Sequence, residues 1–443
     1  MIDRADRAPS PRLQRTSIVI AGFGQNMVLT FVSTFLLLYL TEYAKISNAG
    51  LAVVSVILAA AKVFDAVNDP VMGVFVDKTR SRWGKLRPYI LFSALPVAFF
   101  SAILFCLPNS GETFKLVFFA VCLLFWDAAY TACDVPFWGL IGAAFESEER
   151  TRVISYVRAF GAIALGLATL GGPWLAKLLS FSADTTAAGW SRAAIVICIV
   201  GMSMFLLAFF NTRERHLPPE EGVSLKTLFA TFFKNKPLYL VLLGSILGFG
   251  RDIVQAGGAV FALIAYHDEG YFTLIGASII LGMVAASFLS PLLLRRMPAR
   301  TLMIASTLFA SAVYAAMYFV GFANLYAMMG MIFLTGVTLG VFSVVQTTMI
   351  ADAVDSVERE TGVRNDGLSF SSLTFVSKLM GSLAVLVFGM MLSFTGYESG
   401  IVVTPQMQNT VFLSITIIPA LSCLVSIVPF LLYKLPQEDR LRQ

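Results

Sequence analysis

The sequence has few charged residues and almost none of the residues that bind transition metals. Only 13% of its 443 residues are charged, against about 25% in a typical soluble domain. The two histidines, His216 and His267, lie near no Cys or Glu pair with metal-ligand spacing. The five cysteines are odd in number and form no CxxC motif. These absences argue against a zinc or haem site, and we expect no cofactor and interpret the cysteines as small core residues.

Long apolar segments dominate the rest of the chain. Hydrophobic residues make up 57% of it, and the mean hydropathy is +0.79. A spanning helix needs about 20 mainly apolar residues, and such segments recur without the alternation that barrel strands show. The sequence therefore predicts an all-α integral membrane protein that crosses the lipid bilayer of the inner (plasma) membrane many times. Twelve transmembrane helices are expected, near residues 17–43, 51–76, 89–107, 115–144, 152–180, 189–211, 236–266, 270–294, 300–321, 324–352, 368–395 and 409–433.

Basic residues predict the orientation in the membrane. In short loops they gather on the cytoplasmic side, and here they are frequent before the first span and after each even-numbered span, as at Lys85 and Arg87. The opposite loops contain almost none. Both termini are therefore expected in the cytoplasm. Loop lysines and arginines facing anionic lipid also account for the net charge of +5, so no nucleic-acid partner is expected.

The longest interior polar stretch, residues 211–236, separates six spans from six. Two six-helix bundles joined by a cytoplasmic linker are typical of the major facilitator superfamily fold, whose substrate site lies between the halves near the midplane. The expected parts are a tail at 1–16, an N-terminal bundle at 17–211, a linker at 212–235, a C-terminal bundle at 236–433 and a tail at 434–443.

Ionisable residues in the second span indicate a cation site. An ionisable residue at bilayer depth costs at least about 2.5 kcal/mol, so it normally faces a cavity or a partner. The i, i+3, i+4 spacing of Asp65, Asn68 and Asp69 puts them on one helix face. Their oxygens suit a hard monovalent cation such as Na⁺, or a proton. The alternative is an internal ion pair between Lys62 and one of the acids, which leaves the second carboxylate over.

The fourth span repeats this pattern with an aromatic residue added. Tyr130, Thr131 and Trp138 lie one turn from Asp134 and share its helix face. An indole beside a carboxylate suits a polyol, because the ring stacks on C–H groups while the acid accepts hydroxyl protons. The alternative is that Trp138 is an interfacial anchor.

Basic residues occur in three later spans. Arg158 lies in the fifth span, and Lys378 lies in the eleventh, with Thr374 one turn before it. Arg251 stands beside Asp252 in the seventh span. For this last pair, contact with a substrate and pairing with neighbouring helices are equally expected.

Two further acids, Asp352 and Asp355, stand near the cytoplasmic end of the tenth span. We expect them to serve a gate with Arg359 or Arg364 in preference to binding a ligand.

Three segments, FDAVNDPVMGVFVDKTRSRWGKLRPYI, YTACDVPFWGL and LTFVSKLMG, resemble the glycoside/pentoside/hexuronide:cation symporter family of the major facilitator superfamily, to which the melibiose permease belongs. The likeness runs over nearly the whole chain, and the combination of DAxNDPxxG with RxGxxRP is specific. It implies a symporter that couples Na⁺, Li⁺ or H⁺ to the transport of a sugar.

The resemblance also implies roles for individual residues. The cation site would comprise Asp65, Asn68, Asp69 and Thr131, with Asp134 linking it to the sugar site. The implied sugar pocket contains Trp138, Arg158 and Thr374, with Lys378 close to both sites. Their positions in the spans add Tyr130 and Arg251 to the predicted substrate contacts.

One departure from the family concerns the sugar site. Asn26 stands where the family has a sugar-binding aspartate, and Gln25 stands where it has the preceding lysine. An amide at position 26 lacks the charge of a carboxylate. Because Arg158 and Lys378 remain, we hypothesise that the substrate is an acidic sugar, such as a hexuronide or another anionic glycoside.

The sequence therefore predicts a secondary active symporter, functional as a monomer, that couples cation influx to uptake of a sugar or glycoside by alternating access. A sodium-coupled lysolipid carrier of the same fold is the main alternative. A membrane-embedded enzyme is disfavoured because no set of nucleophile and base occurs, and a channel is disfavoured because it would require rings of like residues from symmetric subunits.

Overall fold

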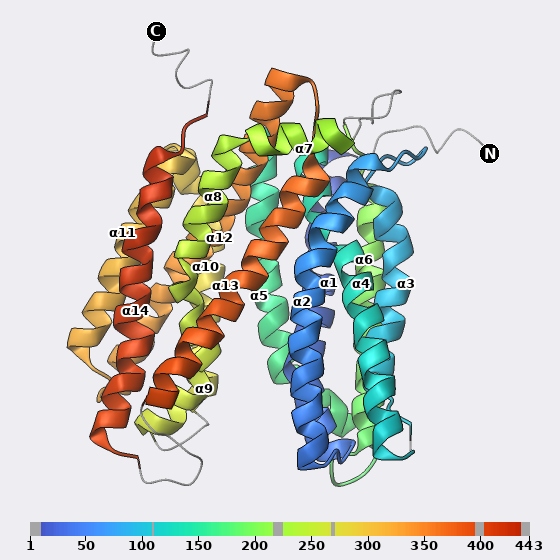
Figure 1. Ribbon diagram of the computed structural model, residues 1–443, viewed down its shortest axis with the longest axis vertical. Helices are drawn as coiled ribbons and strands as arrows, with labels where there is room; N and C mark the ends of the chain where they lie inside the picture. Colours follow the sequence, from blue (N-terminus) through green and yellow to red (C-terminus); the bar gives the residue numbers. More distant parts are fainter. Residues whose placement is uncertain (1–9, 109, 216–224, 267–270, 395–402, 436–443) are drawn as a thin grey trace. The chain divides into compact units, whose positions relative to one another are not determined.

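The structure is a computed structural model and describes residues 10–108, 110–215, 225–266, 271–394 and 403–435. Every secondary-structure element in this part of the chain is a helix (Figure 1). The elements are α1 (Pro11–Leu38), η1 (Tyr39–Tyr43, a π-helix), α2 (Asn48–Lys78), α3 (Arg87–Ile103), α4 (Glu112–Ala144), α5 (Ser147–Leu178), α6 (Ala187–Asn211), α7 (Leu225–Lys234), α8 (Lys236–Leu247), η2 (Phe249–Asp252, a 3-10 helix), α9 (Ile253–Tyr266), α10 (Tyr271–Leu294), α11 (Ala299–Val320), α12 (Leu325–Thr361), α13 (Asp366–Phe394) and α14 (Pro405–Leu432).

The expected spans all fall on helices. Among the described residues, nine helices are long and apolar enough to cross a membrane, or ten if the bent pair formed by α8 and the following helix is one span. α3 is shorter, at 17 residues, and the long α2 carries several acids. The predicted all-α, multi-pass membrane fold is confirmed. Among the described residues, length and composition alone identify fewer than the twelve expected spans.

The ends of the helices, and their closest contacts, follow from local sequence. The Ser47 side chain accepts the amide N–H of Gly50 and caps α2, and Asn235 caps α8 in the same way. Pro136 lies inside α4 without ending it, which a membrane helix tolerates when its neighbours satisfy the freed backbone groups. A Cβ atom on Gly24 would lie 2.3 Å from the Gly201 carbonyl oxygen, so α1 and α6 approach at backbone distance.

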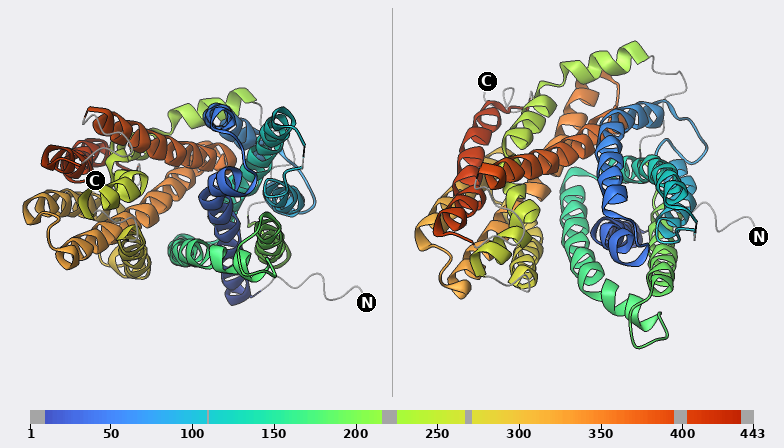
Figure 2. Two further views of the ribbon diagram at one scale, coloured as in Figure 1. Left: turned by 90° about the horizontal axis from the view of Figure 1, so that it is seen from below. Right: turned by 60° about the horizontal axis from the view of Figure 1, so that its bottom comes forward.

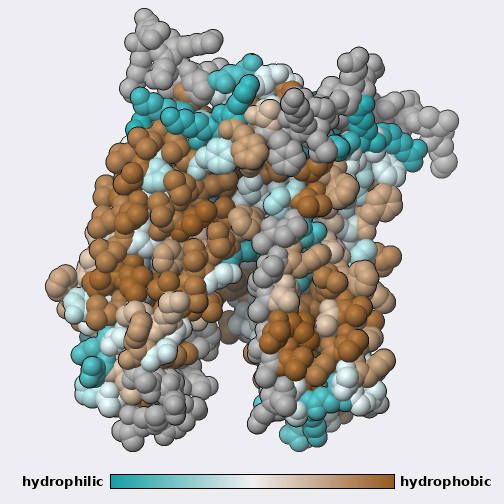
Figure 3. All heavy atoms as spheres, viewed as in Figure 1, coloured by the Kyte–Doolittle hydropathy of each residue, from teal (hydrophilic) through white to brown (hydrophobic). Residues whose placement is uncertain are grey.

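Two compact units make up the chain. Unit 1 contains Met1–Val153, Phe160–Leu228 and Asn365–Ser371, and unit 2 contains Ile154–Ala159, Phe229–Arg364 and Ser372–Gln443. On the face shown in Figure 3, apolar side chains cover the middle of the helices and hydrophilic ones gather near their ends. This pattern fits helices whose outer surfaces contact lipid.

Within unit 1, α1 packs on α6, α2 packs on α4, and α3 packs on both α4 and α6 (Figure 2). Along the chain α3 follows α2 and returns in the opposite direction, so α2 and α4 run in the same direction. An aromatic cluster that includes Phe31, Phe35 and Trp190 joins α1 to α6, with ring centroids 5.0–5.9 Å apart. These contacts fix α1, α2 and α4, the three helices that carry most of the predicted site.

Within unit 2, α10 and α11 pack on α12, and α14 packs on α8, α9 and α11. The core of this unit includes the buried residues Phe261, Tyr314 and Phe412. The seventh span, expected as one segment over residues 236–266, is broken at η2, where the two parts bend by 48°.

Candidate functional site

The predicted cation face joins α2 to α4 inside unit 1. The Thr131 hydroxyl donates a hydrogen bond of 3.0 Å to Oδ1 of Asp69. Asp69 and Thr131 are 0% and 1% exposed, and Asp65, one turn earlier on α2, is 5% exposed. A buried carboxylate and hydroxyl in contact provide the oxygen ligands that a hard monovalent cation prefers.

Asn68 completes this face of α2. Its Nδ2 atom is sheltered from solvent and has no hydrogen-bond partner among the described residues. The Lys62 side chain lies outside the described residues, so the alternative of an internal ion pair stays a prediction. No group of three or more His, Cys, Asp or Glu side chains that could hold a metal ion occurs in the described ranges.

Gln25 connects α1 to the acid of α4. Its Nε2 atom donates a hydrogen bond of 2.8 Å to Oδ1 of Asp134 and lies 3.5 Å from the Tyr130 hydroxyl. The Gln25 side chain is buried, with 1% exposure. Tyr130 in turn stacks on Trp126, with ring centroids 5.4 Å apart. The sequence marks position 25 only as a departure from the family, and in the structure its side chain is a hydrogen-bond partner of Asp134.

Asn26 and Trp138 are the other two predicted sugar-site residues in unit 1. Asn26 turns back on its own helix, where its Nδ2 donates to the Gly22 carbonyl at 2.8 Å. Its amide also packs close to Gly161 of α5. Trp138 is 7% exposed and meets Phe137 edge to face at 5.8 Å. An interfacial anchor would expose its ring to lipid headgroups, so the burial of Trp138 disfavours that alternative.

Four predicted substrate contacts belong to unit 2. Arg158 of α5 donates from Nη2 to the Thr347 hydroxyl of α12 at 3.0 Å. Thr374 is buried, and Lys378, one turn later on α13, is partly buried. The structure therefore divides the predicted residues into one set in unit 1 (Asn26, Asp65, Asn68, Asp69, Tyr130, Thr131, Asp134 and Trp138) and one set in unit 2 (Arg158, Arg251, Thr374 and Lys378).

Arg251 is buried and contacts several neighbouring helices. The guanidinium is 2% exposed and lies 4.2 Å from the centre of the Phe342 ring. Its Nη2 atom donates to the Thr307 and Ser426 hydroxyls at 3.0 and 3.4 Å, and Nη1 donates to the Gly248 carbonyl at 3.2 Å. These are contacts with neighbouring helices, as the second interpretation of Arg251 expects, and they hold the break between α8 and α9.

A buried ionic triad lies at the end of α2. Lys85 Nζ is 3.1 Å from Asp77 Oδ1 and 3.0 Å from Asp366 Oδ2, and the three side chains are 0–7% exposed. Asp77 also accepts the N–H groups of Gly367 and Leu368 in the first turn of α13, at 3.0 and 2.8 Å. Burial alone would lower the pKa of the Lys85 ammonium, but the charges of Asp366 and Asp77 outweigh it and raise this pKa above its ordinary value.

The loop between α2 and α3 is organised around one glutamate. Glu214 accepts the N–H groups of Lys85, Leu86 and Arg87 at 2.8–3.0 Å and so caps α3. Burial raises the pKa of the Glu214 carboxyl, although these three hydrogen bonds oppose the rise. Gly84 has a φ of +105°, and a Cβ atom there would lie 2.4 Å from Glu214 Oε1. The glycine of the RxGxxRP motif is therefore required by conformation and by close approach.

The C-terminal end of α12 contains the predicted acid and base pair. Arg364 Nη1 lies 2.9 Å from Asp355 Oδ1 and 2.6 Å from Glu358 Oε2. Pairing of Asp355 with Arg364 is therefore confirmed, and its role as a gate stays a prediction.

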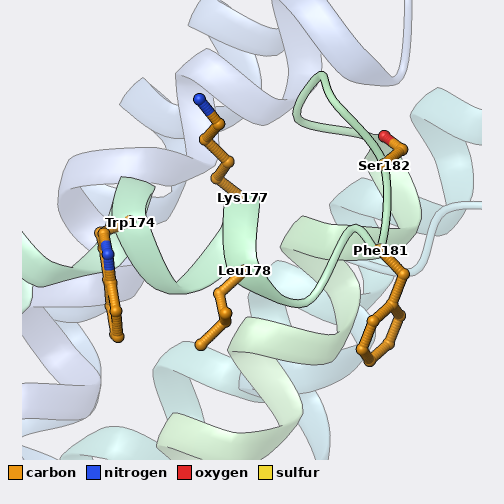
Figure 4. Close-up of a pocket in the computed structure, with 5 residues that line it drawn as sticks. All are labelled: Trp174, Lys177, Leu178, Phe181 and Ser182. Atoms are coloured by element: carbon orange, nitrogen blue, oxygen red, sulfur yellow. The ribbon is translucent and has the colours of Figure 1, made fainter.

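A surface pocket at the end of α5 is separate from all of these residues. It is lined by Trp174, Lys177, Leu178, Phe181 and Ser182 (Figure 4). In the close-up the rings of Trp174 and Phe181 point one way and Lys177 points the other. None of the predicted site residues lines this pocket, and the exposure of Trp174 and Phe181 is typical of side chains that meet the bilayer interface.

Comparison with known proteins shows the family to which the chain is similar. A family model described as MFS/sugar transport protein matches residues 17–437. The isoprimeverose transporter of Lactiplantibacillus pentosus is 27% identical, over 97% of this chain and 90% of its own length. A glucuronide carrier protein homolog of Escherichia coli is 26% identical, over 95% and 92% of the two chains. The crystal structure of a transporter called FucP in an outward conformation has a TM-score of 0.70 at 13% identity, over 95% of this chain and 98% of that one, and this likeness shows the fold alone.

Proposed function

This chain belongs to the MFS/sugar transport protein family, and we propose that it is a symporter that couples the entry of Na⁺, or of H⁺ or Li⁺, to the uptake of a sugar or glycoside. It is a multi-pass membrane transporter and not an enzyme. One observation carries the proposal: on α4, Thr131 contacts Asp69 and Asp134 contacts Gln25, one turn apart. A single helix thus links the residue pair suited to a cation with the acid suited to sugar hydroxyls.

Coupling follows from this placement. A cation held by Asp65, Asn68, Asp69 and Thr131 restricts the motion of the α4 turn that carries Asp134. The carboxylate of Asp134 is then preorganised to accept hydrogen bonds from sugar hydroxyls. By thermodynamic reciprocity, a bound sugar raises the affinity for the cation by the same factor. Alternating access by a monomer in the inner membrane, with both termini in the cytoplasm, completes the proposal.

The charge of the sugar depends on positions 25 and 26 together. The hypothesis of an acidic sugar rests on the loss of a carboxylate at Asn26 together with the retained Arg158 and Lys378, but Gln25 removes a lysine as well. The two differences therefore remove one charge of each sign. Asp134 remains to accept hydroxyl protons, and a carboxylate disfavours an anion beside it. We propose a neutral glycoside as the substrate class, with a hexuronide second because Arg158 and Lys378 are retained and a glucuronide carrier homolog is among the relatives.

Transport in membrane vesicles tests this proposal. We expect Na⁺ or another monovalent cation to stimulate the uptake of a radiolabelled neutral glycoside, and methyl galactoside to compete with it more strongly than a glucuronide does. Competition by the glucuronide alone would establish the acidic sugar and remove the neutral one. Counterflow of lysolipid without counterflow of any sugar would instead support the lipid carrier.

Gln25→Met is expected to weaken sugar binding without removing cation coupling. Methionine keeps the length of the side chain but loses the N–H group that Asp134 accepts. A hydrogen bond to a charged group is worth about 1.5–3 kcal/mol, so the sugar concentration for half-maximal uptake should rise at least about tenfold. Thr30→Val, at another buried position of α1, is the matched control. An unchanged half-saturating concentration in Gln25→Met would mean that Gln25 does not position Asp134.

A further inference from the structure

The first span of each six-span half carries the same short motif. Residues 22–28 read GFGQNMV in the first span, and residues 248–254 read GFGRDIV in the seventh. The two halves of a transporter of this fold are structural repeats, so its first and seventh spans are counterparts. The repeat therefore pairs Gln25 with Arg251 and Asn26 with Asp252.

The packing within each unit supports this pairing. A Cβ atom on Gly24 would clash with the Gly201 carbonyl of α6, and a Cβ atom on Gly250 would lie 2.7 Å from Cα of Pro419 in α14. In each unit the second glycine of the motif is thus a point where the first span meets the last. The next position, 25 or 251, is buried, and the one after it, 26 or 252, is partly exposed. The two segments therefore have equivalent surroundings in their own units.

The two partly exposed side chains differ in their bonds. Asn26 donates from Nδ2 to the Gly22 carbonyl at 2.8 Å. The counterpart of that carbonyl, on Gly248, accepts from Arg251 Nη1 at 3.2 Å instead. A carboxylate has no N–H group to donate, and within the described part of the chain no residue forms a hydrogen bond or an ion pair with the Asp252 side chain. Its two oxygens are therefore available to a ligand.

The depth of Asp252 in the membrane restricts what it can face. It stands near the middle of the span expected over residues 236–266 and ends η2, where the helix is bent by 48°. An ionisable side chain at this depth turns away from lipid, towards a partner or a water-filled cavity. Because the Asp252 side chain is partly exposed, we assign it to water inside the membrane. Substrates of transporters with this kind of repeat bind near the same depth.

We propose that Asp252 is a sugar-binding residue that favours neutral glycosides. Its two carboxylate oxygens accept hydrogen bonds from sugar hydroxyls, the role that the proposed function gives to Asp134 in unit 1. The same negative charge disfavours a hexuronide, because two carboxylates close together repel. Of the neighbours in the seventh span, Arg251 thus holds the helices and Asp252 contacts the substrate. This inference rests on the proposed sugar symport and adds a specificity determinant in unit 2.

Sugar binding to the purified protein in detergent tests this assignment. Isothermal titration calorimetry, at a saturating concentration of the coupling cation, gives the dissociation constants of methyl galactoside and methyl glucuronide. The wild type is compared with Asp252→Asn, which keeps the shape and removes the charge. We expect the constant for methyl galactoside to rise about tenfold, because an amide oxygen accepts weaker hydrogen bonds than a carboxylate. The constant for methyl glucuronide should stay the same or fall.

Further measurements separate sugar binding from other roles. The cation affinity measured without sugar should stay within about twofold of the wild type, because the proposed cation ligands belong to unit 1. Asp252→Glu retains the carboxylate and should keep the preference for the neutral sugar. Asp184→Asn makes the same chemical change at an exposed loop position and should alter neither sugar constant. If Asp252→Asn does not fold, Asp252→Ser removes the charge with less bulk and carries the same test.

The possible outcomes distinguish the role of Asp252 from the proposed function. Unchanged constants for both sugars in Asp252→Asn overturn the assignment. Equal weakening of both sugars indicates a structural role and overturns it too, as does a loss of cation affinity with sugar binding intact. If the wild type binds neither sugar with any monovalent cation, the proposed symport itself fails.

Discussion

Asp69→Cys is expected to abolish the stimulation of sugar uptake by Na⁺. The Asp69 carboxylate is fully buried and accepts the hydroxyl of Thr131. Cysteine removes both carboxylate oxygens and the negative charge, and a buried thiol stays neutral. A buried site that loses one of its charged ligands loses several kcal/mol of cation affinity, so the half-stimulating concentration should rise beyond about a hundredfold and leave the measurable range.

The measurement is uptake into membrane vesicles with and without Na⁺ at a fixed membrane potential. Sugar counterflow, which needs no cation gradient, shows whether the variant still folds and binds sugar. Thr131→Ala provides a graded comparison: it removes a neutral ligand, so it should raise the half-stimulating concentration about tenfold and retain stimulation. Undiminished stimulation in Asp69→Cys would contradict the placement of the cation on α2.

Most of the helices were predictable because a long apolar run can be recognised in the sequence without knowledge of its packing partners. The break in the seventh span was not predictable in this way. At the break, the guanidinium of Arg251 donates to the Gly248 carbonyl, to the Thr307 hydroxyl of α11 and to the Ser426 hydroxyl of α14. Residues so distant in the sequence leave no local signal, and a continuous helix was the natural expectation for that segment.

The site was predictable to the level of the helix face but not of every contact. Spacing and family resemblance singled out Asp69 and Thr131, and the structure brings them together. Gln25 was missed because successive residues point about 100° apart on a helix, so only the packing of α1 decides whether position 25 or 26 reaches α4.

Lys85→Met is expected to destabilise the folded protein more than any other single change in the ionic triad. It leaves the carboxylates of Asp77 and Asp366 close together with almost no exposure. Removing one partner from a buried ion pair costs about 3–5 kcal/mol, because the remaining charges stay desolvated. Thermal denaturation of the purified protein in detergent should show a much lower midpoint, or little folded protein. Lys85→Arg keeps the charge and is the matched control.

A second substitution shows whether the loss comes from charge or from packing. In the Lys85→Met background, Asp366→Asn removes one of the two facing charges and should recover most of the midpoint. Asp77→Asn should recover less, because the Asp77 carboxylate accepts the N–H groups of Gly367 and Leu368 and charge-assisted hydrogen bonds are about twice as strong as neutral ones. Equal recovery by both would mean that these N–H bonds add little. No recovery by either would mean that Lys85 stabilises the end of α2 through its aliphatic stem and not through its charge.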